Sequence, residues 1–360
     1  MKTRIMRGIG WCILLLLAGC KTADDTPQVS SDKVNLTLSV ATTLSGNAKS
    51  RADLPEAEKI HTLRVIIFDE NGVEHNELVY DNAVTGVEEL SRKTFEVRTN
   101  SSKTIYLLAN AEKLPDLNLT QSEGLEQRIL GYDQVTIDYL READCLPMSS
   151  SYKFRVNEEN KDCGTLYVAY AATKFTFTFE NQMADGVLGI SDIIINQVAS
   201  TSYLYPQDVD SRWLNRLLNK EIVTSYAIPD VAVHSPFSLE NTERVVIEKG
   251  GTYTFPPVYV TESKNVNALD NEQSYLLGLK IGRGEDAAAD LIRDVQLTDG
   301  TNPLSSLFRN THVDVKIVVK KLDQIEVIKG IYGMINPWVE LEPVEGSIVE
   351  GENQTKMRRL

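Results

Sequence analysis

The histidines are the first residues to test for chemistry, since they serve most often as metal ligands and as general bases. The chain has 360 residues and four histidines, His61, His75, His234 and His312. No two of them stand at the spacing of a metal site, and the chain has no GxSxG, HExxH or phosphate-binding loop motif. We therefore interpret them as strand or surface residues, and we expect no enzyme activity, no metal and no cofactor.

Cys20 is the residue for which the sequence predicts a chemical modification. Positively charged residues precede an apolar run over residues 11–18, which is too short to span a bilayer comfortably. The run ends in Leu17-Ala18-Gly19-Cys20, which resembles the bacterial lipobox. This pattern predicts a lipoprotein signal peptide over residues 1–20, cleavage before Cys20 and acylation of its thiol, for example with palmitate. A plain signal peptide with an incidental cysteine is the alternative.

Two further cysteines, Cys145 and Cys163, remain in the exported chain. In an oxidising compartment they could form a disulfide, which would contribute about 3 kcal/mol by the loop-entropy estimate. Two buried thiols are the alternative. The chain has no CxxC pair, so a zinc site is disfavoured.

The composition is that of a folded protein with an acidic surface. Hydrophobic residues make up 42% and charged residues 24% of the chain, and the formal net charge is -14. A strongly acidic chain repels phosphate groups, so we expect no nucleic-acid partner. The length suggests two domains.

Many segments alternate apolar and polar residues with a period of two, which is typical of half-buried strands. They include residues 34–40, 63–67, 105–107, 175–179, 245–247, 258–260, 277–281 and 313–319. The helix–strand alternation of a parallel α/β sheet is missing. The pattern predicts an all-β protein with two antiparallel β-sandwich domains and few short helices, over residues 122–132 and 210–218.

Two glycine turns are predicted to join strands. Asn71-Gly72 and Gly250-Gly251 each lie between two apolar segments, as in a hairpin. A different connection lies between the strands at 34–40 and 63–68, where small and polar residues surround Arg51. Such a segment is accessible to a protease, so Arg51 is a candidate processing site. An incidental arginine in a loop is the alternative.

Short segments in a shared order carry a resemblance to a known family. They are the lipobox at 17–20, the strand at 58–69 after Arg51, IYLLANA at 105–111, LPMS at 146–149, ATKFTF at 172–177, SYLYP at 202–206, RNTHVDVKI at 309–317 and NPW at 336–338. Together they resemble the fimbrillin family, the lipoprotein-derived type V pilins of Bacteroidales.

The resemblance implies two transthyretin-like sandwiches and a structural subunit of a cell-surface fimbria that supports adhesion. An arginine-specific protease would cut after Arg51, and a removable strand containing Val34, Leu36, Leu38 and Val40 would leave its sheet. A strand from another copy or from a related fimbrial subunit would replace it. The implied location is the cell outer membrane, reached through the lipid, and the fimbrium.

The domain divisions follow from these expectations. We predict the signal peptide at 1–20, a tether with the removable strand at 21–51, an N-terminal sandwich at 52–163 and a C-terminal sandwich with a donor tail at 164–360. The donor candidate carries Val339, Leu341, Val344 and Ile348, interrupted by Pro343, which only an edge strand tolerates. The alternative is that this segment is the domain's own last strand.

Two other roles stay open at this stage. Residues 351–360 are polar and unsuited to strand donation, so the chain could be a fimbrial tip or anchor subunit instead of a stalk subunit. A surface lipoprotein that binds a glycan or another ligand is the second alternative. It would need an exposed aromatic platform, for example around Trp213.

Overall fold

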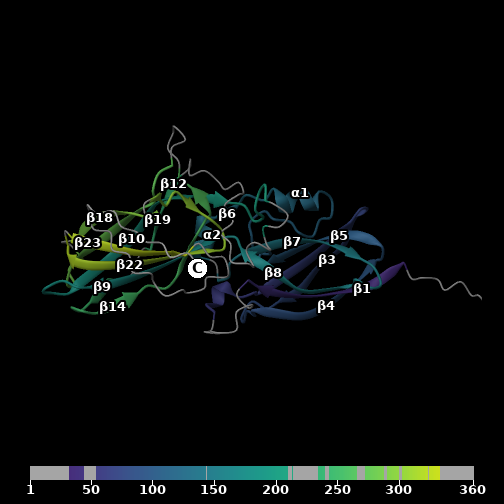
Figure 1. Cartoon of the computed structure of the whole chain (residues 1–360), viewed down its shortest axis with the longest axis horizontal. Coiled ribbons are helices and arrows are strands. Elements are labelled where there is room, and N and C mark those ends of the chain that lie inside the picture. The colour runs from purple at the N-terminus through teal and green to yellow at the C-terminus, as the bar shows by residue number, and fades with distance from the viewer. Residues whose placement is uncertain are drawn as a thin grey trace, which may run out of the picture.

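The computed structural model describes residues 32–43, 54–142, 144–209, 213, 234–239, 243–265, 272–287, 290–299, 302–322 and 324–332. These residues form two β-sandwiches that lie end to end along the long axis of the molecule (Figure 1). Each sandwich has its own cluster of buried apolar side chains. The predicted all-β fold class is confirmed.

Seven strands build the first sandwich, in the order β3-β2-β5-β7-β8-β1-β4. They are β1 (Lys33–Thr42), β2 (Thr62–Asp69), β3 (Gly72–Asp81), β4 (Glu89–Arg98), β5 (Ser101–Ala109), β7 (Met148–Val156) and β8 (Asp162–Tyr170). Strands β7 and β8 pair only through Met148 and Ser149, at one end. The strands therefore separate into a layer β3-β2-β5-β7 and a layer β8-β1-β4. In Figure 1, β5 and β7 of the first layer lie above β1 and β4 of the second.

Short elements pack around this sandwich outside its two layers. They are the single turn η1 (Glu56–Glu58), helix α1 (Leu125–Leu130), helix α2 (Ile137–Glu142) and the strand pair β6 (Val135–Thr136) and β11 (Thr201–Ser202). The helix predicted over residues 122–132 is present as α1 and is shorter. It begins after Gly124, whose φ of 63° is left-handed, and it buries Leu125 and Ile129.

The second sandwich has two main sheets. One contains β12 (His234–Ser238), β10 (Leu188–Ala199), β17 (Leu276–Arg283) and β18 (Leu291–Gln296), with β13 (Val245–Ile247) also on β10. The other contains β14 (Thr252–Thr254), β9 (Thr173–Asn181), β22 (Thr311–Lys321) and β23 (Gln324–Tyr332), with β15 (Val258–Val260) also on β9. The two-residue strands β16 (Ser263–Lys264) and β21 (Ser306–Leu307), and β19 (Thr298–Asp299) and β20 (Asn302–Pro303), form two small pairs.

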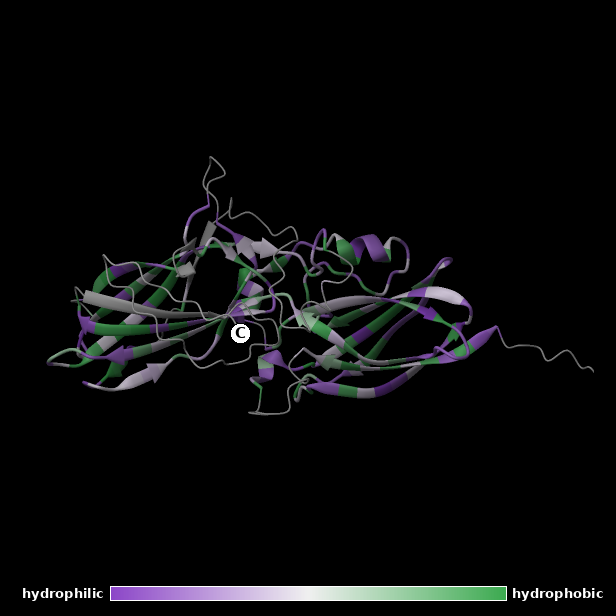
Figure 2. Ribbon diagram, in the orientation of Figure 1, coloured by the Kyte–Doolittle hydropathy of each residue, from purple (hydrophilic) through white to green (hydrophobic). Residues whose placement is uncertain are grey.

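The period of two explains why these segments are strands with one buried face. In β9 the side chains of Phe175, Phe177 and Phe179 are fully buried, whereas the residues between them are half-buried. Figure 2 shows the corresponding bands of hydrophobic and hydrophilic residues along the strands. Each sandwich also contains one parallel pair, β1 with β8 and β9 with β22, which the prediction of antiparallel sandwiches did not include.

One of the two predicted glycine turns forms a hairpin and the other does not. Glu70 and Asn71 form the loop between β2 and β3, and Gly72, at a φ of 112°, begins β3 and pairs with Asp69, so the predicted hairpin is confirmed. Gly250-Gly251 also joins two strands, β13 and β14, as predicted, but these strands do not pair with each other. The strand before it, β13, pairs with β10, and the strand after it, β14, pairs with β9, so this turn carries the chain from one sheet to the other.

The division predicted after residue 163 falls inside a strand. Cys163 lies in β8, which pairs with β1 and β7 and ends at Tyr170, and β9 of the second sandwich begins at Thr173. The physical reason for the difference is a β-bulge. Thr37 pairs with Asp162 but Ser39 pairs with Thr165, so β8 has an extra residue next to Gly164, whose φ is 65°. Gly164 would suit a turn, but in this structure it lies within a ladder of paired strands.

Candidate functional site: the slot occupied by β1

Strand β1 is the middle strand of its layer and forms part of the first core. The side chains predicted to belong to a removable strand all point inward: Val34 is 6% exposed, and Leu36, Leu38 and Val40 are 0% exposed. Full burial of such a side chain contributes about 1.5–3 kcal/mol, so the four contribute roughly 6–12 kcal/mol as an upper bound. An empty slot would expose this apolar surface to water.

Hydrogen-bonded ladders hold both edges of β1. It pairs antiparallel with β4, from Lys33 opposite Arg98 to Ala41 opposite Glu89. It pairs parallel with β8 only from Thr37 onward. The first residues of β1 therefore have a ladder on one side alone, whereas the second half is enclosed by two strands. β1 therefore lies between β4 and β8, two strands that do not pair with each other.

The end of β1 lies at the junction with the second sandwich. The amide of Thr43 donates to the carbonyl of Val168 (3.3 Å), and its hydroxyl donates to the side-chain oxygen of Asn310 (3.2 Å). The next described residue along the chain is Leu54, and η1 begins at Glu56. Only the segment 44–53 therefore connects β1 covalently to the rest of the described chain.

Buried charges fix η1 against the second sandwich. The carboxylate of Glu58, whose side chain is 0% exposed, lies 2.7 Å from the ammonium of Lys174 and accepts a hydrogen bond from Tyr259 (2.7 Å). Burial, and next the charge of Glu58, raise the pKa of Tyr259 above its ordinary value, so its phenol stays protonated and can donate. The chain that follows the candidate processing site is thus anchored at the junction independently of β1.

A second buried ion pair lies on the other side of this junction. The guanidinium of Arg309 contacts the carboxylate of Glu262, and both side chains are at most 1% exposed. Arg309 also donates to the carbonyls of Leu204 (2.9 Å) and Tyr203 (2.7 Å). The two carbonyl hydrogen bonds connect the segment after β11 to the turn before β22, so Arg309, held by Glu262 within the second sandwich, joins the ends of the two sandwiches.

Several predicted site residues lie outside the described residues. These are Cys20, Arg51, Val339, Leu341, Val344 and Ile348. Cys145 and Cys163 are described, and both are free thiols, the first buried and the second half-buried. Burial raises the pKa of both, that of Cys163 to about 12, so neither is a reactive thiolate at neutral pH.

The aromatic residue proposed for a ligand platform is buried. Trp213 is 3% exposed and Tyr205 is 8% exposed, so neither presents a ring face to a surface ligand. Among the described residues, no group of three His, Cys, Asp or Glu side chains is arranged to hold a metal ion. In the same part of the chain, no helix is long and apolar enough to cross a membrane.

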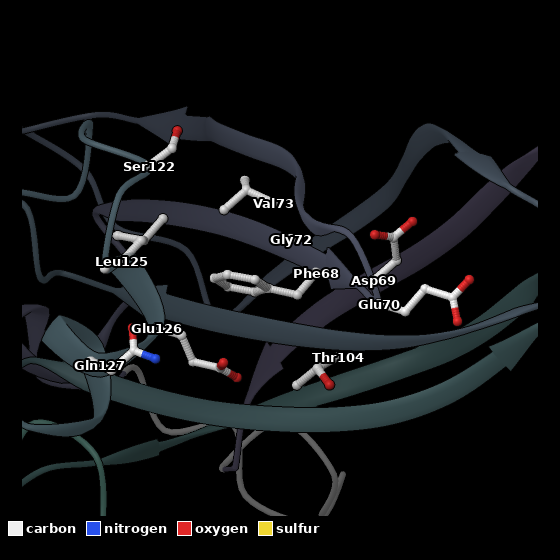
Figure 3. Close-up of a pocket in the computed structure, with 11 residues that line it drawn as sticks. Phe68, Asp69, Glu70, Gly72, Val73, Thr104, Ser122, Leu125, Glu126 and Gln127 are labelled. Carbon is white, nitrogen blue, oxygen red and sulfur yellow. The ribbon is translucent and has the colours of Figure 1, made fainter.

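A pocket of about 400 Å³ lies between α1 and the hairpin of β2 and β3. Figure 3 shows the ring of Phe68 at its centre, with Asp69 and Glu70 on one side and residues of α1 on the other. Burial alone would raise the pKa of Asp69, but the amide of Asn71 and the charges of Lys103 and Arg98 lower it below its ordinary value. Asp69 therefore stays ionised and paired, which suits a structural role better than proton transfer.

Comparison with known proteins relates part of this chain to a fimbrial family. Residues 33–191 match the family model described as the major fimbrial subunit protein (FimA). This match begins at the first residue of β1 and extends into β10, so it includes the whole first sandwich. The resemblance to the fimbrillin family is confirmed. A comparison with curated proteins found no matching sequence.

Solved structures show the same fold at low sequence identity. The tip fimbrial protein Mfa3 of Porphyromonas gingivalis, solved with a C-terminal truncation, is 12% identical, with a TM-score of 0.53 over 84% of this chain and 99% of that chain. A protein of Parabacteroides distasonis ATCC 8503, provisionally described as a cell adhesion protein, is 14% identical, with a TM-score of 0.50 over 85% of this chain and 99% of that chain. Both similarities extend over the two sandwiches, so they concern the whole fold.

Proposed function

We propose that this protein is a structural subunit of a cell-surface fimbria, assembled with copies of itself or with related fimbrial subunits and supporting adhesion. The family match over residues 33–191 and the shared two-sandwich fold support this role. The single observation that carries the proposal further is the position of β1. It fills the middle of a layer, and only residues 44–53 connect it to the next described part of the chain.

Strand exchange follows from that position. A cut after Arg51 would leave β1 attached to the first sandwich by hydrogen bonds and apolar packing alone. Loss of β1 without a replacement would expose an apolar slot and the unpaired edges of β4 and β8, which is unfavourable. A strand from a sibling subunit with apolar residues at alternate positions would cover the apolar slot and pair with both edges. Exchange would therefore join two subunits without a covalent bond.

The export route is part of the same proposal. The lipobox ending at Cys20 would attach the precursor to the outer membrane through its lipid, and an arginine-specific protease would then cut after Arg51. The strand donor would be the segment with Val339, Leu341, Val344 and Ile348. A stalk subunit needs all these steps, whereas an anchor subunit would keep its lipid and remain uncut, and a tip subunit would accept a strand without donating one.

Material sheared from the cell surface tests the proposal and separates these roles. A chain that begins at Ala52 and forms a ladder of heat-labile multimers on a denaturing gel is expected of a stalk subunit. A chain that begins at lipidated Cys20 is expected of an anchor. Absence of the chain from every surface polymer would contradict a fimbrial role.

The processing step has a matched control. Arg51→Ala is expected to leave β1 covalently attached and to block polymer formation, whereas Lys49→Ala removes a positive charge from the same segment and should leave assembly unchanged. The measurement is the gel ladder from sheared material. Normal filaments from Arg51→Ala would exclude Arg51 as the processing point.

A further inference from the structure

Strand β4 is the strand whose place depends most directly on β1. Within the described residues, β1 is the only strand with which β4 forms a ladder, and β1 separates it from β8. When β1 leaves, as the proposed function requires, β4 loses that ladder. A replacement strand can pair with β4 only if β4 stays where β1 left it, so other contacts must hold it there.

Arg98, the last residue of β4, makes such contacts with the opposite layer. Its backbone amide donates to a carboxylate oxygen of Glu74 on β3 (2.6 Å), and its guanidinium lies 3.6 Å from the same oxygen. The guanidinium also contacts the carboxylate of Asp69 at the end of β2. Arg98 thus connects the edge of one layer to two strands of the other through ion pairs and one amide hydrogen bond.

Buried Lys103 on β5 holds the two carboxylates in place. Its side chain is 0% exposed, its ammonium contacts Glu74 and lies 3.6 Å from Asp69. The side chains of Asp69 and Glu74 are themselves only 1% and 10% exposed. Two positive and two negative charges balance one another at this end of the sandwich. Because three packed strands position the carboxylates, Arg98 binds to a preformed site.

His75 provides a second connection from β3 to β4. Its Nε2 lies 2.8 Å from the backbone carbonyl of Glu96, and its ring packs edge-on against Phe95, with ring centres 5.5 Å apart. Phe95 is 2% exposed and points into the core. The contact therefore fixes both the backbone and an inward-facing side chain of β4.

The opposite end of β4 is anchored as well. Just before the strand begins, Val87 and Ile60 form a two-bond bridge, with N···O distances of 2.8 and 2.9 Å. Ile60 belongs to the segment that follows η1 and stays with the sandwich after a cut at Arg51. β4 is therefore connected at both ends to parts of the molecule that do not include β1.

From these contacts we propose that Arg98 and His75 hold β4 as a fixed wall of the slot while the slot is empty, so that a strand from a sibling subunit can insert. This inference rests on the proposed function and adds its positioning residues. While β1 is present, its ladder already holds β4, and Lys103 still pairs with both carboxylates if Arg98 is removed. The loss of Arg98 should therefore affect exchange much more than the stability of the uncut chain.

Exchange can be measured with β1 itself as the probe. A sequence-specific protease site inserted next to Arg51 allows a single cut in the purified full chain. A fluorescent peptide of residues 33–43 is then added, and its uptake is followed by anisotropy. For Arg98→Ala we expect uptake of the labelled peptide to fall about tenfold or more, as for the loss of a hydrogen bond to a charged group. Arg98→Lys should restore part of it.

A matched control separates charge from position. Arg155 is an exposed arginine on β7, which pairs with neither β1 nor β4, so Arg155→Ala should exchange like the wild type. Thermal unfolding of the uncut chain shows whether Arg98→Ala folds. If it does not, His75→Ala removes a different contact between β3 and β4 and tests the same inference. Equal uptake by the wild type and by the folded Arg98→Ala and His75→Ala variants would overturn this inference alone. No uptake by the cut wild type would overturn strand exchange itself.

Discussion

The hydroxyl of Thr43 donates a hydrogen bond of 3.2 Å to the side-chain oxygen of Asn310. Thr43 follows β1 in the first sandwich, and Asn310 precedes β22 in the second. The same oxygen accepts a bond from the backbone amide of Tyr170 at the end of β8 (3.2 Å), and the backbone amide of Asn310 donates to the carbonyl of Ala172 (2.7 Å). The end of β1 and the end of its neighbour β8 are therefore joined at one residue of the other sandwich.

Thr43→Val tests this connection. Valine keeps the shape of threonine but removes the donor, so the uncut chain should lose about 0.5–1.5 kcal/mol of unfolding free energy. After a cut at residue 51, β1 should leave faster, because one of its contacts with the rest of the molecule is gone. The measurements are urea denaturation and release of a labelled β1. Thr94→Val, at an exposed position on β4, is the control and should change stability by less than about 0.5 kcal/mol. Equal release from both variants would argue against the connection.

Leu36→Ala tests the packing of β1 in its slot. Leu36 is fully buried, so truncation should cost about 2–5 kcal/mol of unfolding free energy through lost burial and a cavity. Asn35→Ala changes the preceding residue, which is exposed on the other face of the same strand, and should cost less than about 0.5 kcal/mol. Urea denaturation of both uncut variants measures the difference. Similar losses of unfolding free energy in the two variants would mean that the buried face of β1 contributes no more to stability than its exposed face.

The strands at the slot could be predicted because their signal is local. Val34, Leu36, Leu38 and Val40 alternate with polar residues, and this period alone determines which face is buried. The bulge near Gly164 gave no such signal. Glycine adopts a positive φ both in turns and in bulged strands, so the sequence does not distinguish the two. The boundary placed there therefore fell inside β8.

The charged residues at the ends of the sandwiches could not be paired from sequence. Glu58 and Lys174 are 116 positions apart, and only the packing of two sandwiches brings them together. Lys103 did carry a usable signal, since it occupies an inward position of a strand whose next inward residues are Ile105 and Leu107. A lysine at such a position must be buried and therefore paired. The identity of its partners still required the fold.

Lys174→Met tests the buried pair at the junction. Removing the ammonium leaves the Glu58 carboxylate at 0% exposure with its charge uncompensated, which should cost about 3–5 kcal/mol of unfolding free energy. Adding Glu58→Gln removes that charge, so the double variant should be less destabilised than the sum of the two single changes, with a coupling of about 0.5–3 kcal/mol. Urea denaturation of the four chains completes the cycle. Simple additivity would show that the two groups do not interact.

The pH dependence of stability should reveal His312. Burial, and next the charge of Lys174, lower its pKa from the ordinary 6.5 to about 3 in the folded protein. Its Nε2 lies 2.7 Å from the hydroxyl of Thr176, which itself donates to Asp314 (2.9 Å), so the neutral ring serves as a donor. Between pH 6.5 and 3 the unfolded chain binds a proton that the folded protein does not bind. The unfolding free energy therefore falls as the pH falls through this window.

The expected loss from this residue between pH 7 and pH 5 is about 2 kcal/mol, from at most about 1.4 kcal/mol per pH unit. Above pH 7 the contribution should be flat, since His312 is then neutral in both states. Carboxylates with lowered pKa values, such as Asp69 and Asp290, lose their protective charge only at lower pH, so this window isolates the histidine. His312→Asn keeps an amide donor for Thr176 and cannot be protonated. Urea denaturation at pH 7 and pH 5 should show a smaller loss for this variant, and an unchanged loss would place the titrating group elsewhere.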